Sequence, residues 1–363
     1  TLDSSIFNNA KSDGSDIRVL DGAGNALPFE LVNYDKSNQK GQIYFKASSL
    51  SSSNDSDFKI VYGNSAASSV DNSSSIGRDA VWQDYLAVYH FENDGVDATG
   101  NGRDLSPNSN PDDGDLIGNA TDLDGTNTWS LQDTSDWLDG RNSLSISSWI
   151  QSNQTDTNQG FIRVGEFSGS DNQISLRYDQ FGASWGDDPS ACRNCLKVGI
   201  EHENSGEDTN IETGDHTQTT NQQFVAVTSE NGQKFDVFLD GVSEKTSSQD
   251  QQGTVKIPSD KDTLTIGAGT NDIAAGGWDG LIDEVRFKKD KADSDWIKAE
   301  HQNQKTPSSF YSYANQTDTI DSNSGYSHFT TGYLERLSES ANINLQASQD
   351  IKLDLQGATL DVA

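Results

Sequence analysis

The stretch that decides the fold class is QFVAVTSENGQKFDVFLDG, residues 223–241. Two runs within it, 223–228 and 234–239, are rich in Val and Phe, residues that favour extended strands. Asn231-Gly232 lies between the runs, and this dipeptide favours the positive φ angles of a tight hairpin turn. Asp240-Gly241 supplies a second turn directly afterwards. The stretch therefore predicts neighbouring antiparallel strands.

Similar short runs, bounded by Gly, Asn, Asp and Ser, continue on both sides of this hairpin. We predict further strands over 85–91, 143–150, 161–164, 174–178, 196–200, 263–266 and 280–287. One helix is predicted over 293–302, where Ser294 caps the first turn and Trp296, Ile297 and Ala299 face inward. Many short strands with one helix are typical of an all-β protein built as a sandwich.

The chain divides into parts of different character. Strands are predicted over 16–20, 42–46 and 58–62, before a Ser/Asn-rich stretch at 64–77. We therefore predict a small β-sandwich domain (1–70), a linker (71–79), a larger sandwich (80–308) and a C-terminal β tail (309–363). The tail alternates apolar and polar residues over 342–362, and such one-faced strands must bury their apolar side against something else. This predicts a homo-oligomer, or a larger virion or filament assembly, formed through the tail.

The chain is strongly acidic. Of its 363 residues, 57 are Asp or Glu and 25 are Lys or Arg, which gives a formal charge of −32. This charge repels phosphates and anionic lipids, so we expect no nucleic-acid partner. No run of 18 apolar residues is present, so we expect no membrane insertion. Self-repulsion of this size favours a halophilic source, where salt shortens the screening length to about 3 Å near 1 M, over an ordinary acidic secreted protein.

The start of the chain points to processing and export. It begins at Thr1 and contains no Met, so we interpret it as a processed or trimmed product. Asn-x-Ser/Thr sequons, for example at Asn54 and Asn315, fit an exported protein. We therefore expect an extracellular location, at the surface of a cell or a virion.

Four ordered segments carry a family resemblance. These are AVYHFEND (87–94), DATGNGRDLS (97–106), LSISSWI (144–150) and WDGLIDEVRF (278–287), together with the hairpin above. Over about 80–305 the chain resembles laminin-G-like, concanavalin A-like jelly rolls. Residues 1–70 resemble a domain of unknown function that often precedes such jelly rolls in microbial surface and viral proteins. The usual first strand of that domain is missing, which implies trimming before Thr1 or a strand supplied from elsewhere.

The resemblance implies a structural calcium ion. Its ligands would be Asp283, Asp97, Asn101 and a carbonyl near Glu92, because Ca²⁺ prefers hard oxygen ligands. The alternative is that Asp283 faces Arg286 or a backbone amide. A second candidate, the run from Asp122 to Asn127, has the oxygen spacing of an EF-hand start but no Glu at its twelfth position. We predict that this run is a strand ending in an Asp-Gly turn.

Sugar binding needs exposed aromatic faces and planar polar groups. Four tryptophans lie in Asp- and Gly-rich contexts where a ring could be exposed: Trp129, Trp137, Trp185 and Trp278. The loop 182–194 is the most binding-like segment, so the candidate ligand-binding residues are Trp185, Asp187, Asp188, Asn194 and Trp278. Trp149 and Trp296 are predicted to lie in the core.

The chain has two cysteines, Cys192 and Cys195, in a C-x-x-C motif. A redox motif would need a βαβ context, and zinc would need further ligands. A local disulfide fits an oxidising exterior better.

Catalytic motifs are poorly supported. Gly182-Ala-Ser184-Trp-Gly186 matches a nucleophile elbow, but that turn requires a strand-to-helix context. The Glu-x-Asp-x-x-Glu pattern of concanavalin-type glucanases, which sets two carboxylates on one face, does not occur. We therefore predict a non-enzymatic recognition or adhesion protein whose partner is a cell-surface glycan or glycoprotein. The alternatives are a structural filament or capsid-decoration subunit, and a divergent glycoside hydrolase.

Overall fold

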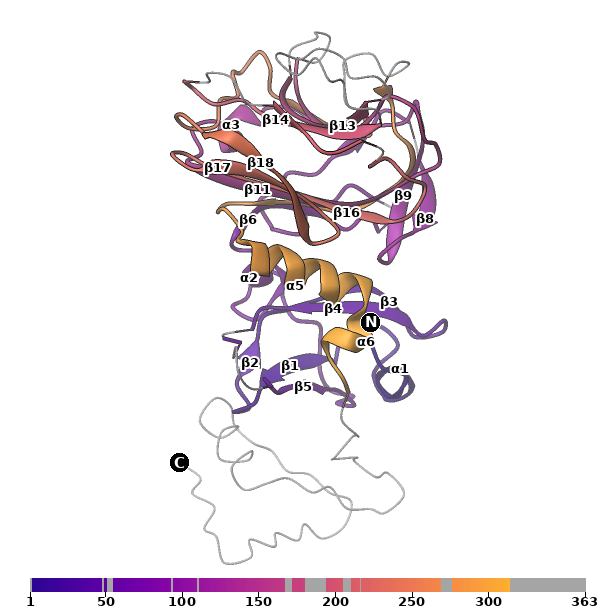
Figure 1. Ribbon diagram of the computed structural model, residues 1–363. Helices are drawn as coiled ribbons and strands as arrows, with labels where there is room; N and C mark the ends of the chain where they lie inside the picture. Colours follow the sequence, from indigo (N-terminus) through magenta and orange to yellow (C-terminus); the bar gives the residue numbers. More distant parts are fainter. Residues whose placement is uncertain are drawn as a thin grey trace, which may run out of the picture.

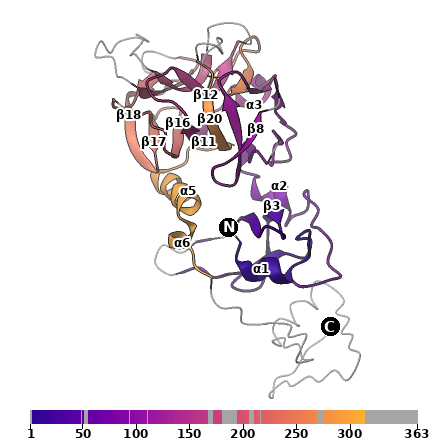
Figure 2. The same ribbon diagram turned by 90° about the vertical axis from the view of Figure 1, so that its right-hand side faces the viewer.

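A computed structural model describes residues 2–47, 49–50, 55–92, 94–109, 111–166, 172–179, 194–204, 210–215, 217–268 and 276–313. The predicted tail beyond residue 313 therefore lies outside the described residues. A two-layered sandwich occupies one end of the molecule, and a smaller N-terminal domain lies beyond one of its faces (Figure 1). Helix α5 (Ser294–Lys305) lies on that same face in both views (Figures 1 and 2).

Within the described residues the sandwich consists of two antiparallel sheets. The seven-stranded sheet runs β15 (Asn210–Glu212), β14 (Cys195–Ile200), β13 (Asn172–Asp179), β12 (Gln159–Gly165), β19 (Thr263–Ile266), β10 (Trp129–Leu131) and β7 (Ser106–Pro107). The eight-stranded sheet runs β18 (Val242–Asp250), β17 (Lys234–Leu239), β16 (Gln223–Glu230), β11 (Ser143–Ser152), β20 (Asp279–Lys288), β9 (Asn119–Asp124) and β8 (Asp112–Asp115). Strand β6 (Tyr85–Tyr89) also pairs with β20.

The hairpin that decides the fold class forms as predicted. Strands β16 and β17 pair antiparallel, with Val225 opposite Leu239 and Thr228 opposite Asp236. Gly232 has a φ of 74° in the connecting turn, and Asp240 and Gly241 have φ angles of 48° and 77° in the next. These are left-handed conformations that Asn, Asp and Gly adopt most readily. Local turn chemistry therefore sets the register of this part of the sheet.

The core between the sheets is built from large apolar and aromatic side chains. Phe161, Tyr178 and Trp278 are fully buried there, with the Phe161 and Tyr178 ring centroids 5.5 and 6.2 Å from that of Trp278. Trp129 and Trp137 belong to the same core. Burial of such rings accounts for a folded state in a chain with only 32% hydrophobic residues.

The N-terminal domain has two small sheets and a helix. Strands β2 (Ala26–Leu27), β1 (Arg18–Asp21) and β5 (Phe58–Val61) form one sheet, and β3 (Phe29–Asp35) pairs with β4 (Lys40–Phe45). The strands predicted over 16–20, 42–46 and 58–62 correspond to β1, β4 and β5. Helix α1 (Ser4–Asn9) was not predicted, although Asp3 caps it and its own residues Ile6 and Phe7 are buried. Helices α2 (Arg78–Val81) and α3 (Ser135–Leu138) are single turns.

The helix predicted over 293–302 is α5, followed by the short helix α6 (Pro307–Phe310). Its cap is Asp293, not Ser294: the Asp293 carboxylate accepts a 2.7 Å hydrogen bond from the Trp296 amide. Ile297 is buried, but Trp296 is 49% exposed, so the prediction of a core position for Trp296 is wrong. Successive helical residues lie about 100° apart, so the face that directs Ile297 and His301 toward the sheet turns Trp296 outward.

Candidate functional site

The two outer faces of the sandwich have different surroundings. The outer face of the eight-stranded sheet, here called the covered face, carries the apolar side chains Trp149 and Phe224. They pack against Ile297 of α5, and the ring of His301 stacks on Trp149 at 5.4 Å. The Trp149 indole N–H donates to the side chain of Gln304 at 2.8 Å. This face is therefore occupied by the protein itself.

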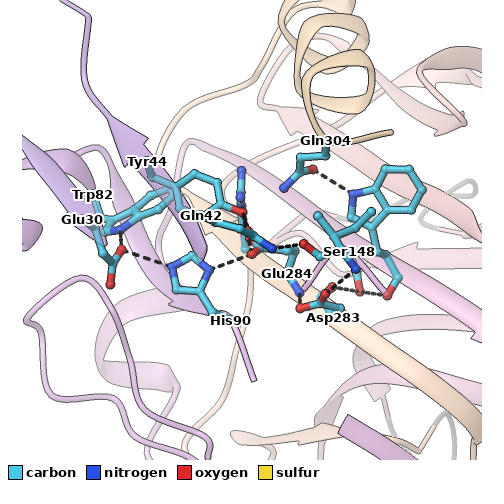
Figure 3. Close-up of polar contacts among 12 residues, drawn as sticks. Glu30, Gln42, Tyr44, Trp82, His90, Ser148, Asp283, Glu284 and Gln304 are labelled. Carbon is cyan, nitrogen blue, oxygen red and sulfur yellow. Dashed lines mark hydrogen bonds and ion pairs between the residues drawn. The ribbon is translucent and has the colours of Figure 1, made fainter. Parts of the chain in front are cut away.

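A buried polar network joins the covered face to the N-terminal domain (Figure 3). Its centre is Glu284 of β20, whose carboxylate accepts hydrogen bonds of 2.8 Å from the Tyr44 hydroxyl and 3.1 Å from Arg286 Nε. Glu284 also lies 2.8 Å from His90 Nδ1. On its other side the His90 ring lies 3.2 Å from Glu30, which also accepts a hydrogen bond from the Trp82 indole. Glu30 and Tyr44 belong to the N-terminal domain, so the network crosses the domain junction.

The charges of this network compensate one another. Burial alone would raise the pKa of Glu284, but His90 and Arg286 lower it to about 2. Burial would also lower the pKa of His90, whereas the carboxylates of Glu284 and Glu30 raise it to about 10. His90 and Arg286 therefore stay positive, and Glu284 stays negative, across the neutral range. Such an arrangement holds two domains together because each buried charge has a partner.

A bulge shapes the strand at this point. The pairing of β11 with β20 shifts register between Ser147 and Trp149, and Glu284 has a φ of 51°. The neighbouring Asp283 accepts hydrogen bonds from the amides of Ile117, at 3.0 Å, and Glu284, at 2.6 Å. Bulges re-aim side chains in this way at specialised positions of a sheet. Here the bulge accompanies two successive buried carboxylates with different partners.

The outer face of the seven-stranded sheet points away from the N-terminal domain (Figure 1). Core residues flank Arg163, Ser175, Arg177, Lys197 and Thr265 in sequence, so strand alternation turns these five side chains outward. We call this set the outer cationic face. Ser175 lies opposite Arg163, and Arg177 lies opposite Lys197, in the strand register.

The outer cationic face is polar but well buried. Arg163, Ser175, Arg177 and Lys197 are each between 3% and 7% exposed. Lys197 forms a 2.5 Å ion pair with Glu212 on β15, and Arg163 donates to the Glu166 carbonyl at 2.6 Å. The Ser175 hydroxyl is buried without a hydrogen-bond partner. Its residues converge from neighbouring strands, and the three cations among them already have partners.

A pocket of about 300 Å³ lies elsewhere, where the edge strands β7 and β8 approach each other. Its lining combines the aromatic residues Phe91 and Trp129 with the carboxylates of Asp94, Asp112 and Asp113. Strands β12, β19 and β10 separate β7 from β13 in the sheet order. The pocket is therefore distinct from the outer cationic face.

Residues 123–298 match the family model of the concanavalin A-like lectin/glucanases superfamily. The chain carries a concanavalin A-like jelly roll. Residues 13–99 match a domain of unknown function (DUF2341), so the order of the two parts is the predicted one. This second match extends beyond residue 70, the predicted end of the first domain. It includes β6, which pairs with β20 of the jelly roll. No curated protein matches the chain.

Several solved structures match part of the chain at low identity. Domain 4 of an extracellular GH43 arabinanase from Geobacillus stearothermophilus, in complex with arabinotriose, is 19% identical, with a TM-score of 0.43 over 59% of this chain and 96% of that domain. The binding domain of Paraclostridial Mosquitocidal Protein 1 is 9% identical, with a TM-score of 0.47 over 61% of this chain and 52% of that one. The binding domain of botulinum neurotoxin DC in complex with SialylT is 15% identical, with a TM-score of 0.44 over 61% and 51%. The chain spans about half the length of these toxin domains, and at such TM-scores the likeness carries no information on ligands.

The residues expected to bind calcium fall into two groups in the jelly roll. Asp97 is buried and accepts hydrogen bonds from the amides of Val88 and Thr99. Asn101 lies in the same group, because its amide donates to Thr99 Oγ1 at 2.7 Å. Asp283 instead accepts from backbone amides, which is the alternative considered for it. No cluster of three or more His, Cys, Asp or Glu side chains suited to a metal occurs in the described parts of the chain.

Calcium binding at Asp97 stays a prediction. In the structure, N–H donors surround the Asp97 carboxylate. Binding requires the loop to exchange these donors for oxygen ligands. Glu92 is half-buried, and burial raises its pKa to about 7. A metal that binds only the folded chain stabilises it, so the calcium-loaded chain should melt at a higher temperature than a chelated one. Equal melting temperatures at fixed ionic strength contradict the site.

The second calcium candidate is a turn, as predicted. Strand β9 ends at Asp124, and Gly125 has a φ of 85°. The Asp124 carboxylate accepts hydrogen bonds from the amides of Thr126 and Asn127.

The predicted sugar-binding residues have mixed outcomes. Trp185, Asp187 and Asp188 lie outside the described residues. Trp278 is fully buried against Phe161 and Tyr178, so its assignment to a ligand site is wrong. Its Gly-rich flanks suggested a loop, but its indole N–H donates to the Leu281 carbonyl and its ring completes the core.

Asn194 and Cys195 begin the strand after the candidate loop. Asn194 is 4% exposed, and its side-chain amide donates to the side chain of Asp156. Its side-chain oxygen Oδ1 is buried without a hydrogen-bond partner. Cys195 is fully buried and is not a free thiol. Cys192 lies outside the described residues, so its pairing with Cys195 stays a prediction.

The outer cationic face was missed from sequence. Its only signal is one cation or hydroxyl between two core residues in several strands, as in Ile162-Arg163-Val164 and Leu196-Lys197-Val198. Such alternation is normal for any one strand, and only the sheet order brings these residues together.

Proposed function

We propose that the chain is a non-enzymatic recognition protein that presents its jelly roll to surface glycans or glycoproteins. The observation that carries this proposal is the division of the jelly roll into one covered face and one outer cationic face. Helix α5 and the N-terminal domain occupy the first. The second faces away from both, and four of its polar side chains are between 3% and 7% exposed. Membership of β13 and β14 in a concanavalin A-like jelly roll supports a carbohydrate ligand there.

The same proposal includes a setting. The protein would act outside the cell, on a cell surface or a virion, and would be displayed on an oligomer or larger assembly through residues 309–363. The compensated charges at the junction support display, because they fix the jelly roll relative to its neighbour. None of the described helices is long and apolar enough to cross a membrane. A purely structural subunit would need the same rigid junction but no ligand.

Glycan binding by the intact chain tests the proposal. Thr265→Tyr adds bulk to the outer cationic face and should abolish binding on a panel of neutral and acidic glycans. Ser243→Tyr adds the same bulk to the exposed strand β18 of the other sheet and should leave binding unchanged. Binding that survives Thr265→Tyr places the ligand elsewhere. Binding to no glycan favours the structural alternative, and turnover of a polysaccharide would overturn the non-enzymatic assignment.

A further inference from the structure

We propose that the pocket between β7 and β8 binds an organic cation, an ammonium group carried on a short apolar stem. The inference goes beyond the proposed function and does not depend on it, because this pocket is distinct from the outer cationic face. The pocket lies at the edge of the sandwich that carries β8 (Figure 1). Its volume of about 300 Å³ is at the lower end of the range for small-molecule sites, about 300–1,000 Å³.

The floor of the pocket is apolar. Phe91 and Trp129 line it and are only 2% and 7% exposed, so they form its deep part. Their ring centroids lie 5.9 Å apart. Pro107 of β7, which lies opposite Trp129 in the strand register, lines the same pocket. Contact with these groups favours a ligand that buries methylene groups there.

The mouth of the pocket is acidic. Its lining includes the exposed residues Asp94, Asp112 and Asp113. Asp113 lies opposite Thr121, whose hydroxyl accepts a 2.9 Å hydrogen bond from the Trp129 indole. Directly opposed residues share one face of a sheet, so Asp113 projects from the same side of its sheet as Thr121. Exposed carboxylates therefore surround an opening whose floor is aromatic.

The lining accepts hydrogen bonds but donates few. An ionised carboxylate only accepts, and the Trp129 N–H already donates to Thr121. Among the described lining residues there is no Lys, Arg or His. An ammonium group donates three hydrogen bonds and accepts none, so it complements this lining. An anion would bring only acceptors, and a sugar ring would bring hydroxyls to an apolar floor.

The charge at this edge of the sheet provides an independent observation. Asp112 lies opposite Asp122, and burial together with neighbouring carboxylates, Asp112 first among them, raises the pKa of Asp122. Asp115, at the end of the same strand, lies 3.8 Å from Lys40, whereas no ion pair within the described residues involves Asp94 or Asp112. Directly opposed like charges destabilise a sheet, so a bound cation would relieve this repulsion.

The experiment measures binding of three probes to the full chain by calorimetry at neutral pH and fixed ionic strength. The probes are n-butylammonium, n-butanol, which lacks the charge, and ammonium, which lacks the stem. We expect butylammonium to bind at least about tenfold more tightly than ammonium, a ratio that corresponds to burial of about two methylene groups. It should also bind at least about tenfold more tightly than butanol, since hydrogen bonds to charged groups are about twice as strong as neutral ones.

Three results would overturn the inference. Equal binding of butylammonium and butanol would mean that the carboxylates select no charge. Equal binding of butylammonium and ammonium would mean that the aromatic floor receives no stem. Calcium that displaces butylammonium and binds more tightly would make the pocket an inorganic cation site.

Two further probes distinguish the source of the cation. Nα-acetyl-lysine methylamide represents a lysine side chain of a partner protein, and putrescine represents a free polyamine. Both should compete with butylammonium, and the tighter of the two identifies the source. Failure of both to compete overturns the inference.

Variants locate the binding. Asp94→Asn and Asp112→Asn remove charge at exposed positions without changing side-chain size, so the chain should fold, as its melting temperature would show. Each should weaken butylammonium binding several-fold, and the two together at least about tenfold. Asp115→Asn makes the same charge change on β8 outside the pocket lining and should leave binding unchanged.

Equal weakening by Asp115→Asn overturns the inference, because the overall charge of −32 would then attract the probe without a site. Glycan binding is a separate readout. If the double variant binds glycans like the wild type but no longer binds butylammonium, the loss belongs to this pocket alone. A failure of glycan binding in the wild type contradicts the proposed function and leaves the cation site standing.

Discussion

His90 shows how one side chain can depend on two domains. It lies 2.8 Å from Glu284 of the jelly roll and 3.2 Å from Glu30 of the N-terminal domain. Its pKa rises from 6.5 to about 10, because these carboxylates outweigh the opposing effect of burial. A raised folded-state pKa means that the protonated form stabilises the fold. The stabilisation is fully present below pH 6.5 and is lost as the pH rises through 10.

We therefore expect His90→Gln to destabilise the chain by about 3–5 kcal/mol near pH 6.5, the usual effect of breaking a buried pair. The gap between wild type and variant should shrink as the pH approaches 10.5. Urea unfolding at several pH values measures it, with Lys245→Gln as an exposed control. A gap that is unchanged up to pH 10.5 would mean that His90 carries no proton in the folded chain.

Sequence could not reveal this residue pair. His90 and Glu284 lie far apart in the chain, and they meet only because β6 pairs with β20. The ligand-site prediction for Trp278 was wrong for a related reason. Its Gly- and Asp-rich flanks predict a loop, whereas its burial depends on Phe161 and Tyr178 from other strands. Local patterns hold no information on either contact.

At the scale of elements, α5 packs against the covered face through a narrow stripe of its side chains. Ile297 is 1% exposed, whereas its neighbour Trp296 is 49% exposed. Ile297→Ala should cost about 2–5 kcal/mol, because it removes buried methyl groups and leaves a cavity against Trp149 and Phe224. Trp296→Ala should cost less than about 1 kcal/mol despite the larger volume removed.

Denaturant unfolding of the two variants measures which of the two side chains contributes more to the stability of the fold. A larger loss for Trp296→Ala would restore the sequence-based expectation that this ring is in the core. The helix itself could be predicted, because ten periodic residues are a local signal, although its cap is Asp293 and not the predicted Ser294. Helix α1 could not, because its six residues are too few to show a period and depend on Ile6 and Phe7 for burial.

At the scale of the whole molecule, the order of the two domains could be predicted, but not how they meet. Ordered motifs identified the jelly roll, since its hairpins and turns are local. The covered face could not be predicted, because it depends on long-range contacts of Glu30 with His90 and of Tyr44 with Glu284. Which sheet face lies against the N-terminal domain therefore follows from the junction and not from the fold alone.

The acidic surface sets the last prediction. Asp112 lies opposite Asp122, and Asp124 lies opposite Asp279, so like charges face each other across β8, β9 and β20. Burial and these neighbouring carboxylates raise the pKa of Asp122. Directly opposed like charges destabilise a sheet. With a formal charge of −32, the same repulsion acts over the whole chain.

Stability should therefore rise with salt and then level off, since the screening length falls from about 10 Å at 0.1 M to about 3 Å at 1 M. We expect a melting temperature at least about 5 °C higher at 1 M NaCl, the equivalent of a few kcal/mol for a chain of this size. Asp122→Asn should raise the melting temperature at 0.1 M and have no effect at 1 M, because screening has by then removed the repulsion that the substitution relieves. Sucrose, which stabilises without screening charge, should leave the advantage of Asp122→Asn intact. An advantage that persists at 1 M NaCl would show that Asp122 destabilises the sheet through burial and not through its like-charged neighbours.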